Sequence, residues 1–287
     1  MTRHGAFWYH TRALRVLFIA EIVGKAGVYC VKSALPELRK ECEIDFVVAN
    51  ADGATGGYGI GKNHAIYLRK LGVDVITGGD QIYFKKDMVP YIESSFSILR
   101  PANFSPAAPG RGWRIFNAGE ERVAVISLLG QSGFDRVHAS NPFTYLPELA
   151  AKARRETPYV IVDFHALTTA EKSTLFHRTD GSVSAIIGTG TRVRTNDAKI
   201  MAGGTAVISD SGRTGSYNSV AGLDAGPEIR KFISSMPERS ADAWGTLQLQ
   251  GVILEIGPDG KATRIEPVTR ACKEASDDRK STSTGDT

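Results

Sequence analysis

The sequence lacks an apolar run long enough to cross a bilayer, which takes about 20 residues. Its first apolar run, LRVLFIA, is short, holds Arg15 and stops at Glu21. This pattern predicts a buried first strand and not a signal peptide. We therefore expect a cytoplasmic protein with no membrane contact.

The sequence also has few cysteines and only a small excess of positive over negative charge. The three cysteines lie far apart with no Cys-x-x-Cys spacing, which excludes a disulfide framework or a zinc knuckle and fits a reducing compartment. The net charge of +4 comes without long basic runs. It permits an anionic small ligand but does not by itself indicate a nucleic-acid binder.

The chain has no internal repeat. In its first third, strand-like stretches alternate with helix-like stretches. Hydrophobic residues make up 42% of the 287 residues, enough for a sizeable core. Short apolar runs predict strands, and the stretches between them predict helices. The alternation predicts a parallel sheet with right-handed crossovers. The expected strands are 14–20, 45–50 and 73–78, and the expected helices 26–40, 61–71 and 84–94.

The second half is richer in strands. Strands are expected within 111–118, 121–130, 158–164, 182–190 and 205–212, helices at 145–156 and 168–176, and a hairpin around Pro258-Asp259-Gly260. We expect two mixed sheets packed face to face with helices outside. They would form one domain over 14–270, between an N-terminal extension, 1–13, and a disordered polar tail, 271–287.

Polar side chains follow five of the expected strands, where each strand ends. They are Glu21, Asp52, Asp80, His165 and Arg192. Carboxyl ends of buried strands are where α/β sheets build their binding sites. Three carboxylates and one imidazole converging there predict a metal pocket with an incomplete ligand set. Taken singly, the acidic residues could be helix caps and the histidine a satisfied interior side chain.

Several phrases of the sequence are specific. RPANF, ITGG and TPYVIVDFHA, with TAEK two residues later, resemble the calcineurin-like metallophosphoesterases, in particular the YmdB-type branch of bacterial 2′,3′-cyclic-nucleotide phosphodiesterases. The resemblance runs from about Leu14 to Val268. It implies a four-layer αββα sandwich of two mixed sheets, two metal ions (iron or manganese), hydrolysis of a phosphodiester, and a possible homo-oligomer.

The same resemblance exposes departures in the ligand set. Gln81 stands at the family's catalytic histidine, and glutamine cannot act as a general acid. Gly53, Gly190 and Arg192 stand at positions where the family has metal ligands, and Arg192 cannot lose its proton to coordinate a metal. Only His165 matches by residue type. A full binuclear centre is therefore not expected.

Two arrangements of the remaining groups stay open. Glu21, Asp52, Asp80 and His165 could hold one divalent cation, Mn²⁺, Mg²⁺ or Fe²⁺. Alternatively, Arg192 lies between the carboxylates and replaces the metal electrostatically, which we favour because a fixed charge there is otherwise hard to explain.

Anion binding is a separate expectation. Arg192, Arg194 and Arg213 fall in loops beside the motif positions, and Asn103 of RPANF could line the same mouth and contact phosphate. A solvated basic rim is the alternative.

Three functions follow. The favoured one is a family member with little or no hydrolysis that binds a phosphate-bearing ligand, such as a nucleotide, or a protein partner. The second is an active phosphodiesterase with an oxygen-rich centre. The third is a structural subunit that docks through the aromatic N-terminal extension with Phe7, Trp8, Tyr9 and Arg12.

Overall fold

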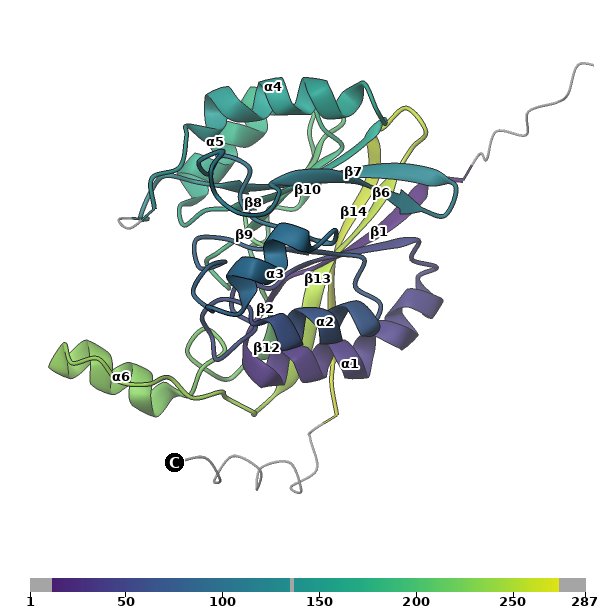
Figure 1. Ribbon diagram of the computed structural model, residues 1–287. Helices are drawn as coiled ribbons and strands as arrows, with labels where there is room; N and C mark the ends of the chain where they lie inside the picture. Colours follow the sequence, from purple (N-terminus) through teal and green to yellow (C-terminus); the bar gives the residue numbers. More distant parts are fainter. Residues whose placement is uncertain (1–11, 135–136, 274–287) are drawn as a thin grey trace, which may run out of the picture.

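Two mixed β-sheets pack face to face, with helices on their outer faces (Figure 1). The computed structural model describes residues 12–134 and 137–273. The eight-stranded sheet has the order β2-β12-β13-β1-β3-β4-β5, with β14 paired to β13. Its strands are β1 (Leu14–Ile19), β2 (Glu21–Ile22), β3 (Phe46–Asn50), β4 (Val75–Thr77), β5 (Ile98–Leu99), β12 (Arg213–Ser216), β13 (Leu247–Ile256) and β14 (Ala262–Ala271).

The second sheet has six strands in the order β10-β11-β9-β8-β7-β6. They are β6 (Trp113–Ala118), β7 (Glu121–Leu129), β8 (Tyr159–His165), β9 (Ala185–Thr189), β10 (Lys199–Ile200) and β11 (Ala206–Ile208). The helices are α1 (Gly24–Glu41), α2 (Lys62–Lys70), α3 (Met88–Ser94), α4 (Pro142–Arg154), α5 (Thr169–Thr179) and α6 (Ala225–Ser234). None of the described helices is long and apolar enough to cross a membrane.

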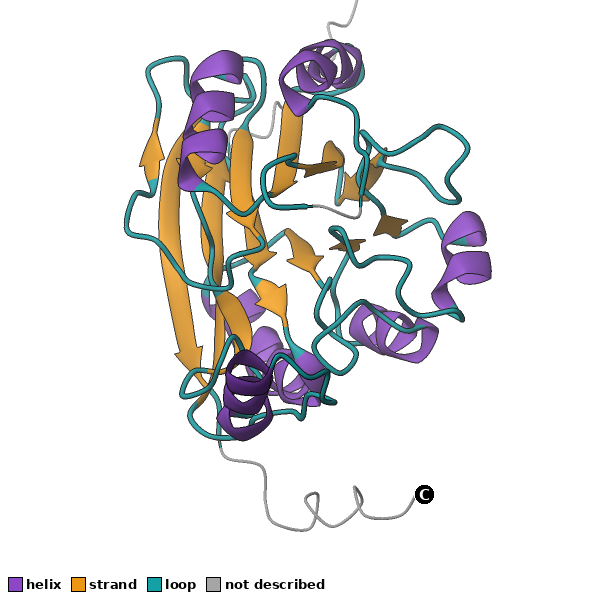
Figure 2. Ribbon diagram, turned by 90° about the vertical axis from the view of Figure 1, so that its left-hand side faces the viewer, coloured by secondary structure: helices purple, strands orange, loops and turns teal. Residues whose placement is uncertain are grey.

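Side-chain alternation along β1 shows how the layers are held. Val16 and Phe18 point into the core between the two sheets, while Leu17 and Ile19 belong to the core that α1 covers. A third core lies between the second sheet and α4 and α5. Figure 2 shows the strands from a second side, with helices above and below them. The predicted four-layer αββα sandwich of two mixed sheets is confirmed.

The predicted elements of the first third are present, each with bounds shifted by a few residues. Five elements were missed: the short strands β2, β5, β10 and β12, and the helix α6. Helix α6 extends away from the body, at the left of Figure 1, and its side chains Phe232 and Ile233 are 88% and 80% exposed. The apolar residues Ile229, Phe232 and Ile233 recur at helical spacing, so a signal for α6 was available in the sequence. Most of the predicted N-terminal extension, 1–11, and of the predicted tail, 274–287, lies outside the described residues.

Parallel pairing aligns the strand ends that matter. β1 runs parallel to β3, β3 to β4, and β8 to β9. The carboxyl ends of these strands therefore open on the same side of the sandwich. The predicted site residues follow those ends.

Candidate functional site

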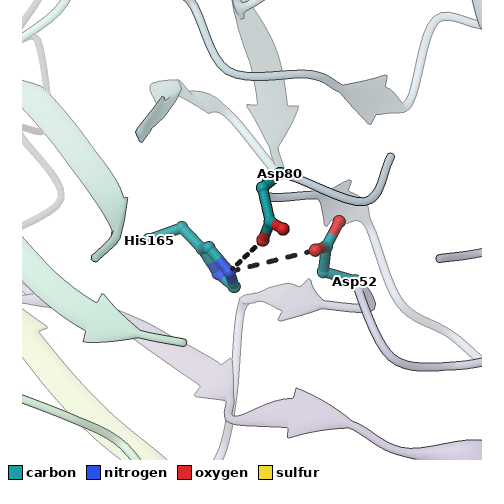
Figure 3. Close-up of side chains that lie close together, drawn as sticks. All are labelled: Asp52, Asp80 and His165. Atoms are coloured by element: carbon teal, nitrogen blue, oxygen red, sulfur yellow. Dashed lines mark ion pairs between the residues drawn. The ribbon is translucent and has the colours of Figure 1, made fainter. Parts of the chain in front are cut away.

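The structure brings together the five polar residues predicted at the strand ends. Glu21, Asp80, His165 and Arg192 line a cleft of about 280 Å³. Asp52 is fully buried beside them, and Figure 3 shows it with Asp80 and His165. The cleft divides into two halves of different chemistry.

The first half, here the arginine half, consists of Glu21, Gly53 and Arg192. Arg192 donates from Nε to Glu21 Oε1 at 2.8 Å, and its Nη2 lies 2.7 Å from the same oxygen. Nη2 also donates to the Gly57 carbonyl at 2.9 Å. Burial alone lowers the pKa of Arg192, but the charge and hydrogen bonds of Glu21 outweigh it and raise the pKa. Arg192 is thus a permanent cation against a buried carboxylate.

Gly53 provides the room for this guanidinium. A Cβ atom at this position would lie 2.8 Å from Arg192 Nη2 and 3.0 Å from Glu21 Oε1. A residue with a side chain here would compete with the guanidinium for the same space. The missing side chain at position 53 therefore leaves the space that the Arg192 guanidinium fills.

A buried ion pair fixes the loop that carries Arg192. Asp210 accepts hydrogen bonds from the Thr191 amide at 3.0 Å and hydroxyl at 2.7 Å, and from Lys172 Nζ at 3.0 Å. Arg213 Nη1 donates to the carbonyl of Arg192 itself at 2.8 Å. Arg192 has a φ of 59°, in the left-handed region that is strained for a residue with a Cβ atom. These contacts hold it there.

The second half, the imidazole half, consists of Asp52, Asp80 and His165. His165 Nε2 lies 3.3 Å from Asp80 Oδ1 and 3.9 Å from Asp52 Oδ2. One donor atom of each residue lies within 4.8 Å of the others. Asp52 also accepts the amides of Gly79 at 2.6 Å and Gln81 at 3.0 Å, which fix its carboxylate.

A hydrogen-bonded chain behind the imidazole half orients the histidine. The Thr189 hydroxyl donates to Asp163 Oδ1 at 2.7 Å, and the same hydroxyl oxygen lies 3.0 Å from His165 Nδ1. Because the hydroxyl proton goes to Asp163, the Thr189 oxygen accepts from Nδ1–H. Nε2 is then directed at the two carboxylates. A lone pair facing carboxylates is repelled, so this point requires a proton or a metal cation.

The pKa values of His165 and Asp52 also indicate that a positive charge is favoured at Nε2. Burial lowers the pKa of His165, but the hydrogen bond to Asp80 and the charges of Asp52 and Glu21 outweigh it and raise the pKa to about 9. Burial raises the pKa of Asp52 to about 7, with the charge of His165 opposing the rise. Both shifts follow from the close approach of the imidazole to the carboxylates, and they favour the charged form of His165 when no metal is bound.

Among the residues that the structure describes, the donor atoms form a candidate site for one cation. Asp52, Asp80 and His165 can each supply one ligand atom to a single ion. On the other side, Glu21 already neutralises Arg192, and Gly53 and Gly190 have no donor side chains. A second dication beside a guanidinium would meet like charge. Glu21 Oε2 is buried without a hydrogen-bond partner, yet it belongs to a carboxylate whose charge is already matched.

The remaining predicted residues divide between the cleft and its surroundings. Gln81 lines the cleft, with a buried side-chain oxygen that has no partner. Arg194 is exposed and donates to Thr269, and Arg213 donates to the carbonyls of Arg192, Ser216 and Tyr217. Asn103 is fully buried, and its amide bonds the backbone of Leu129 and Ser140. Arg194, Arg213 and Asn103 therefore do not line the cleft that the structure describes.

Sequence reasoning missed the residues that position the histidine and close the cleft. Asp163 and Thr189 orient His165, Phe134 stacks on its ring at 6.0 Å between centroids, and Tyr58 lines the wall. Asp163 and His165 are two apart on one strand and so share a face, a signal that was available. Phe134 lies in a loop without periodicity, and no pattern indicated it.

Comparisons with known proteins agree with this architecture. Residues 17–268 match the family described as YmdB-like protein. A 2′,3′-cyclic-nucleotide 2′-phosphodiesterase of Bacillus subtilis is 36% identical over 256 residues, which cover 89% of this chain and 96% of the relative.

Two solved structures superpose closely. A phosphatase from Mycoplasma pneumoniae has a TM-score of 0.85 and 30% identity, covering 92% of this chain and 95% of its own. A protein from Thermus thermophilus has a TM-score of 0.84 and 30% identity, covering 90% of this chain and 100% of its own. The chain belongs to the YmdB-like family of phosphoesterases.

Proposed function

We propose that this protein binds a phosphate-bearing small molecule, such as a nucleotide, in the cleft and hydrolyses it slowly or not at all. The observation that carries the proposal is the Arg192 guanidinium held against Glu21 in the space that Gly53 leaves open. A two-metal hydrolase uses both ions to activate water and clamp the phosphate. A fixed cation supplies the clamp but cannot lower the pKa of a water molecule.

Arg192 retains a donor for a ligand. A guanidinium has five N–H groups, and the described contacts to Glu21, Gly57 and Ala221 occupy four of them. The remaining Nη1–H is available to an anion in the cleft. Charge-assisted hydrogen bonds from arginine to phosphate are among the stronger polar contacts in proteins. Neutralisation by Glu21 moderates this attraction, so we expect weak, reversible binding.

Proton transfer is the step that the cleft supports least. Gln81, at the position where the resemblance places a catalytic histidine, can donate or accept a hydrogen bond but cannot give up a proton. His165 is directed at Asp52 and Asp80 and is buried, with Nδ1 engaged by Thr189. No other described histidine lines the cleft.

A second candidate function is favoured by one observation, the close donor set of the imidazole half. In this candidate the protein is a phosphodiesterase that works with a single divalent cation held by Asp52, Asp80 and His165. A cation held there would polarise a phosphoryl oxygen. Thr189 and Asp163 would orient the imidazole, and Arg192 would orient the phosphate.

Metal content and hydrolysis distinguish the two candidates. The purified protein, supplied with Mn²⁺, is analysed for bound metal and assayed with bis-p-nitrophenyl phosphate, and AMP binding is measured by calorimetry. Measurable AMP affinity with turnover near the uncatalysed rate supports the favoured function. Metal-dependent turnover with about one ion per chain supports the second.

A double substitution tests the reason given for weak hydrolysis. Arg192→His with Gln81→His should raise metal content above that of the wild type, because it removes the guanidinium and adds two imidazoles. Arg194→His with Gln81→His is the matched control, since Arg194 is exposed and bonds Thr269 instead of Glu21. Equal metal content in both double variants would contradict the interpretation of Arg192.

A further inference from the structure

A second cavity, of about 660 Å³, lies beside the start of β6 and shares no lining residue with the cleft. Its wall comes from segments distant in sequence: the end of the turn before β5, the RPANF loop, the first strand residues of β6 and the face of α4 at Tyr145. We call it the arginine cavity.

The arginine cavity holds three guanidinium groups and no carboxylate. Arg100, Arg111 and Arg114 line it, and no aspartate or glutamate does. Among the described residues, none of these arginines forms an ion pair. Burial lowers the pKa of Arg114, and the neighbouring charge of Arg111 lowers it further. Three like charges without counter-ions repel one another, and a bound anion would reduce this repulsion.

Aromatic rings stand beside these charges. The Arg114 guanidinium lies 4.6 Å from the centroid of the Phe96 ring, and Phe96 is 59% exposed. Trp113 and Tyr145 also line the cavity, and Tyr145 is 37% exposed. Exposed rings next to guanidinium planes form a surface on which a flat aromatic group can stack.

The wall is rigid enough to be a site. Arg100 is only 6% exposed, and its Nη1 donates to the carbonyl of Pro101 at 2.7 Å, while its buried Nε has no partner. The turn that presents Arg111 packs tightly on the RPANF loop, because a Cβ at Gly112 would lie 2.1 Å from the Ala102 Cα. Gly110, with a φ of 84°, makes the preceding bend.

We propose that the arginine cavity binds a nucleotide-type anion, with its phosphate on Arg111 and Arg114 and its base against Phe96. The volume lies within the range of small-ligand sites, roughly 300–1,000 Å³. Arginine contributes bidentate contacts to phosphate, and aromatic faces stack any base. The inference is independent of the proposed function, because the two sites have no residue in common.

The test uses a local reporter. The chain has three tryptophans, and Trp113 is the only one among the residues that line either site. The full-length protein is labelled with 5-fluorotryptophan, the Trp113 signal is assigned with Trp113→Phe, and AMP, adenosine and inorganic phosphate are titrated separately. AMP should give a saturable shift of the Trp113 signal and bind more tightly than either fragment.

Two exposed substitutions locate the binding. Arg111→Gln should weaken AMP and phosphate about tenfold, the loss of one charged hydrogen-bonding group. Phe96→Leu should weaken AMP several-fold and leave phosphate unchanged, because a base stacks and phosphate does not. Arg178→Gln, an exposed arginine of α5 outside the cavity, is the matched control.

Three results would overturn the inference. They are an unsaturated Trp113 signal, AMP affinity that Arg178→Gln reduces as much as Arg111→Gln does, and AMP affinity that neither cavity variant changes. If Arg192→Gln abolishes AMP binding while the Trp113 signal stays unshifted, AMP occupies the cleft. That result would support the proposed function and refute the arginine cavity.

Discussion

The two halves of the cleft solve the same electrostatic problem in different ways. Each contains a buried carboxylate near a strand end, Glu21 in the arginine half and Asp52 in the imidazole half. In the arginine half, a covalently attached guanidinium neutralises Glu21. In the imidazole half, the balancing charge is the proton on His165, whose pKa is raised to about 9. The first charge is permanent, whereas the second can be exchanged for a metal ion.

This difference assigns distinct roles to the halves. The arginine half carries a guanidinium that keeps its charge, so it cannot hold a dication without expelling Arg192. The imidazole half responds to both pH and cation concentration, because a proton and a metal compete for one point. Breaking either half therefore has different consequences.

The largest effect is expected from the support of the arginine half. Lys172→Met removes the cation paired with Asp210, and both side chains are almost fully buried, at 0% and 1% exposure. Breaking a buried pair leaves an uncompensated charge, so we expect a loss of about 3 kcal/mol in the free energy of unfolding. Urea unfolding measures it, with the exposed Lys32→Met as control. A loss equal to that of the control would show that the pair does not anchor the Thr191–Arg192 loop.

Removing the guanidinium itself should lower the free energy of unfolding less than Lys172→Met does, and it should allow the arginine half to bind metal. Arg192→Gln leaves Glu21 buried without a partner, but the cleft admits water, since the Arg192 side chain is 11% exposed. We expect a loss of about 2 kcal/mol. Mn²⁺ at about 100 times its dissociation constant would restore about 2.7 kcal/mol through linkage.

Thermal unfolding with and without Mn²⁺ checks this prediction. Mn²⁺ should stabilise Arg192→Gln more than the wild type, because only the variant leaves Glu21 free to join the ligands. Arg194→Gln is the matched control and should behave as the wild type. Equal Mn²⁺ stabilisation of all three proteins would mean that the guanidinium does not exclude metal.

The imidazole half should show a steep pH dependence of cation affinity. A cation must displace the His165 proton, so the affinity rises as pH rises toward about 9. If one proton is displaced, the cation affinity should rise about tenfold per pH unit. Below pH 7, Asp52 also carries a proton, and the slope should approach roughly a hundredfold per unit.

Calorimetric titration with Mg²⁺ at pH 6, 7 and 8 measures this slope. Asp52→Asn separates the two protons: it should weaken binding at every pH and leave only the His165 slope. A pH-independent affinity in the wild type would show that the cation binds elsewhere.

Most of the scaffold was predictable because burial imposes a period on the sequence. The runs LRVLFI and FVVAN are buried on both faces, so they appear as mostly apolar strands, and Glu21 and Asp52 follow them closely. The meeting of those ends follows from parallel pairing. The fixed charge of Arg192 favoured a position among the carboxylates, and the structure pairs it with Glu21.

What escaped prediction depends on three-dimensional proximity alone. Asp210 and Lys172 lie on different elements, and nothing in their local sequence distinguishes this pair from surface residues. Asn103 is the converse case. Its place in a family-specific loop suggested a ligand contact, yet it bonds Leu129 and Ser140 backbone groups. Sequence alone does not distinguish a polar side chain that contacts a ligand from one that hydrogen-bonds the backbone of a neighbouring loop.

The smallest predicted effect tests whether Gly53 and Arg192 are coupled. In Gly53→Ala the new Cβ would lie 2.8 Å from Arg192 Nη2, the far end of a flexible side chain that can shift. We expect a loss of about 1 kcal/mol, the lower range for overpacking. Gly245→Ala, which meets no atom within 4 Å, is the control and should cost less. In the Arg192→Gln background the guanidinium is gone, so the cost of Gly53→Ala should shrink. An undiminished cost would mean that Glu21 or the backbone, and not the guanidinium, requires glycine at position 53.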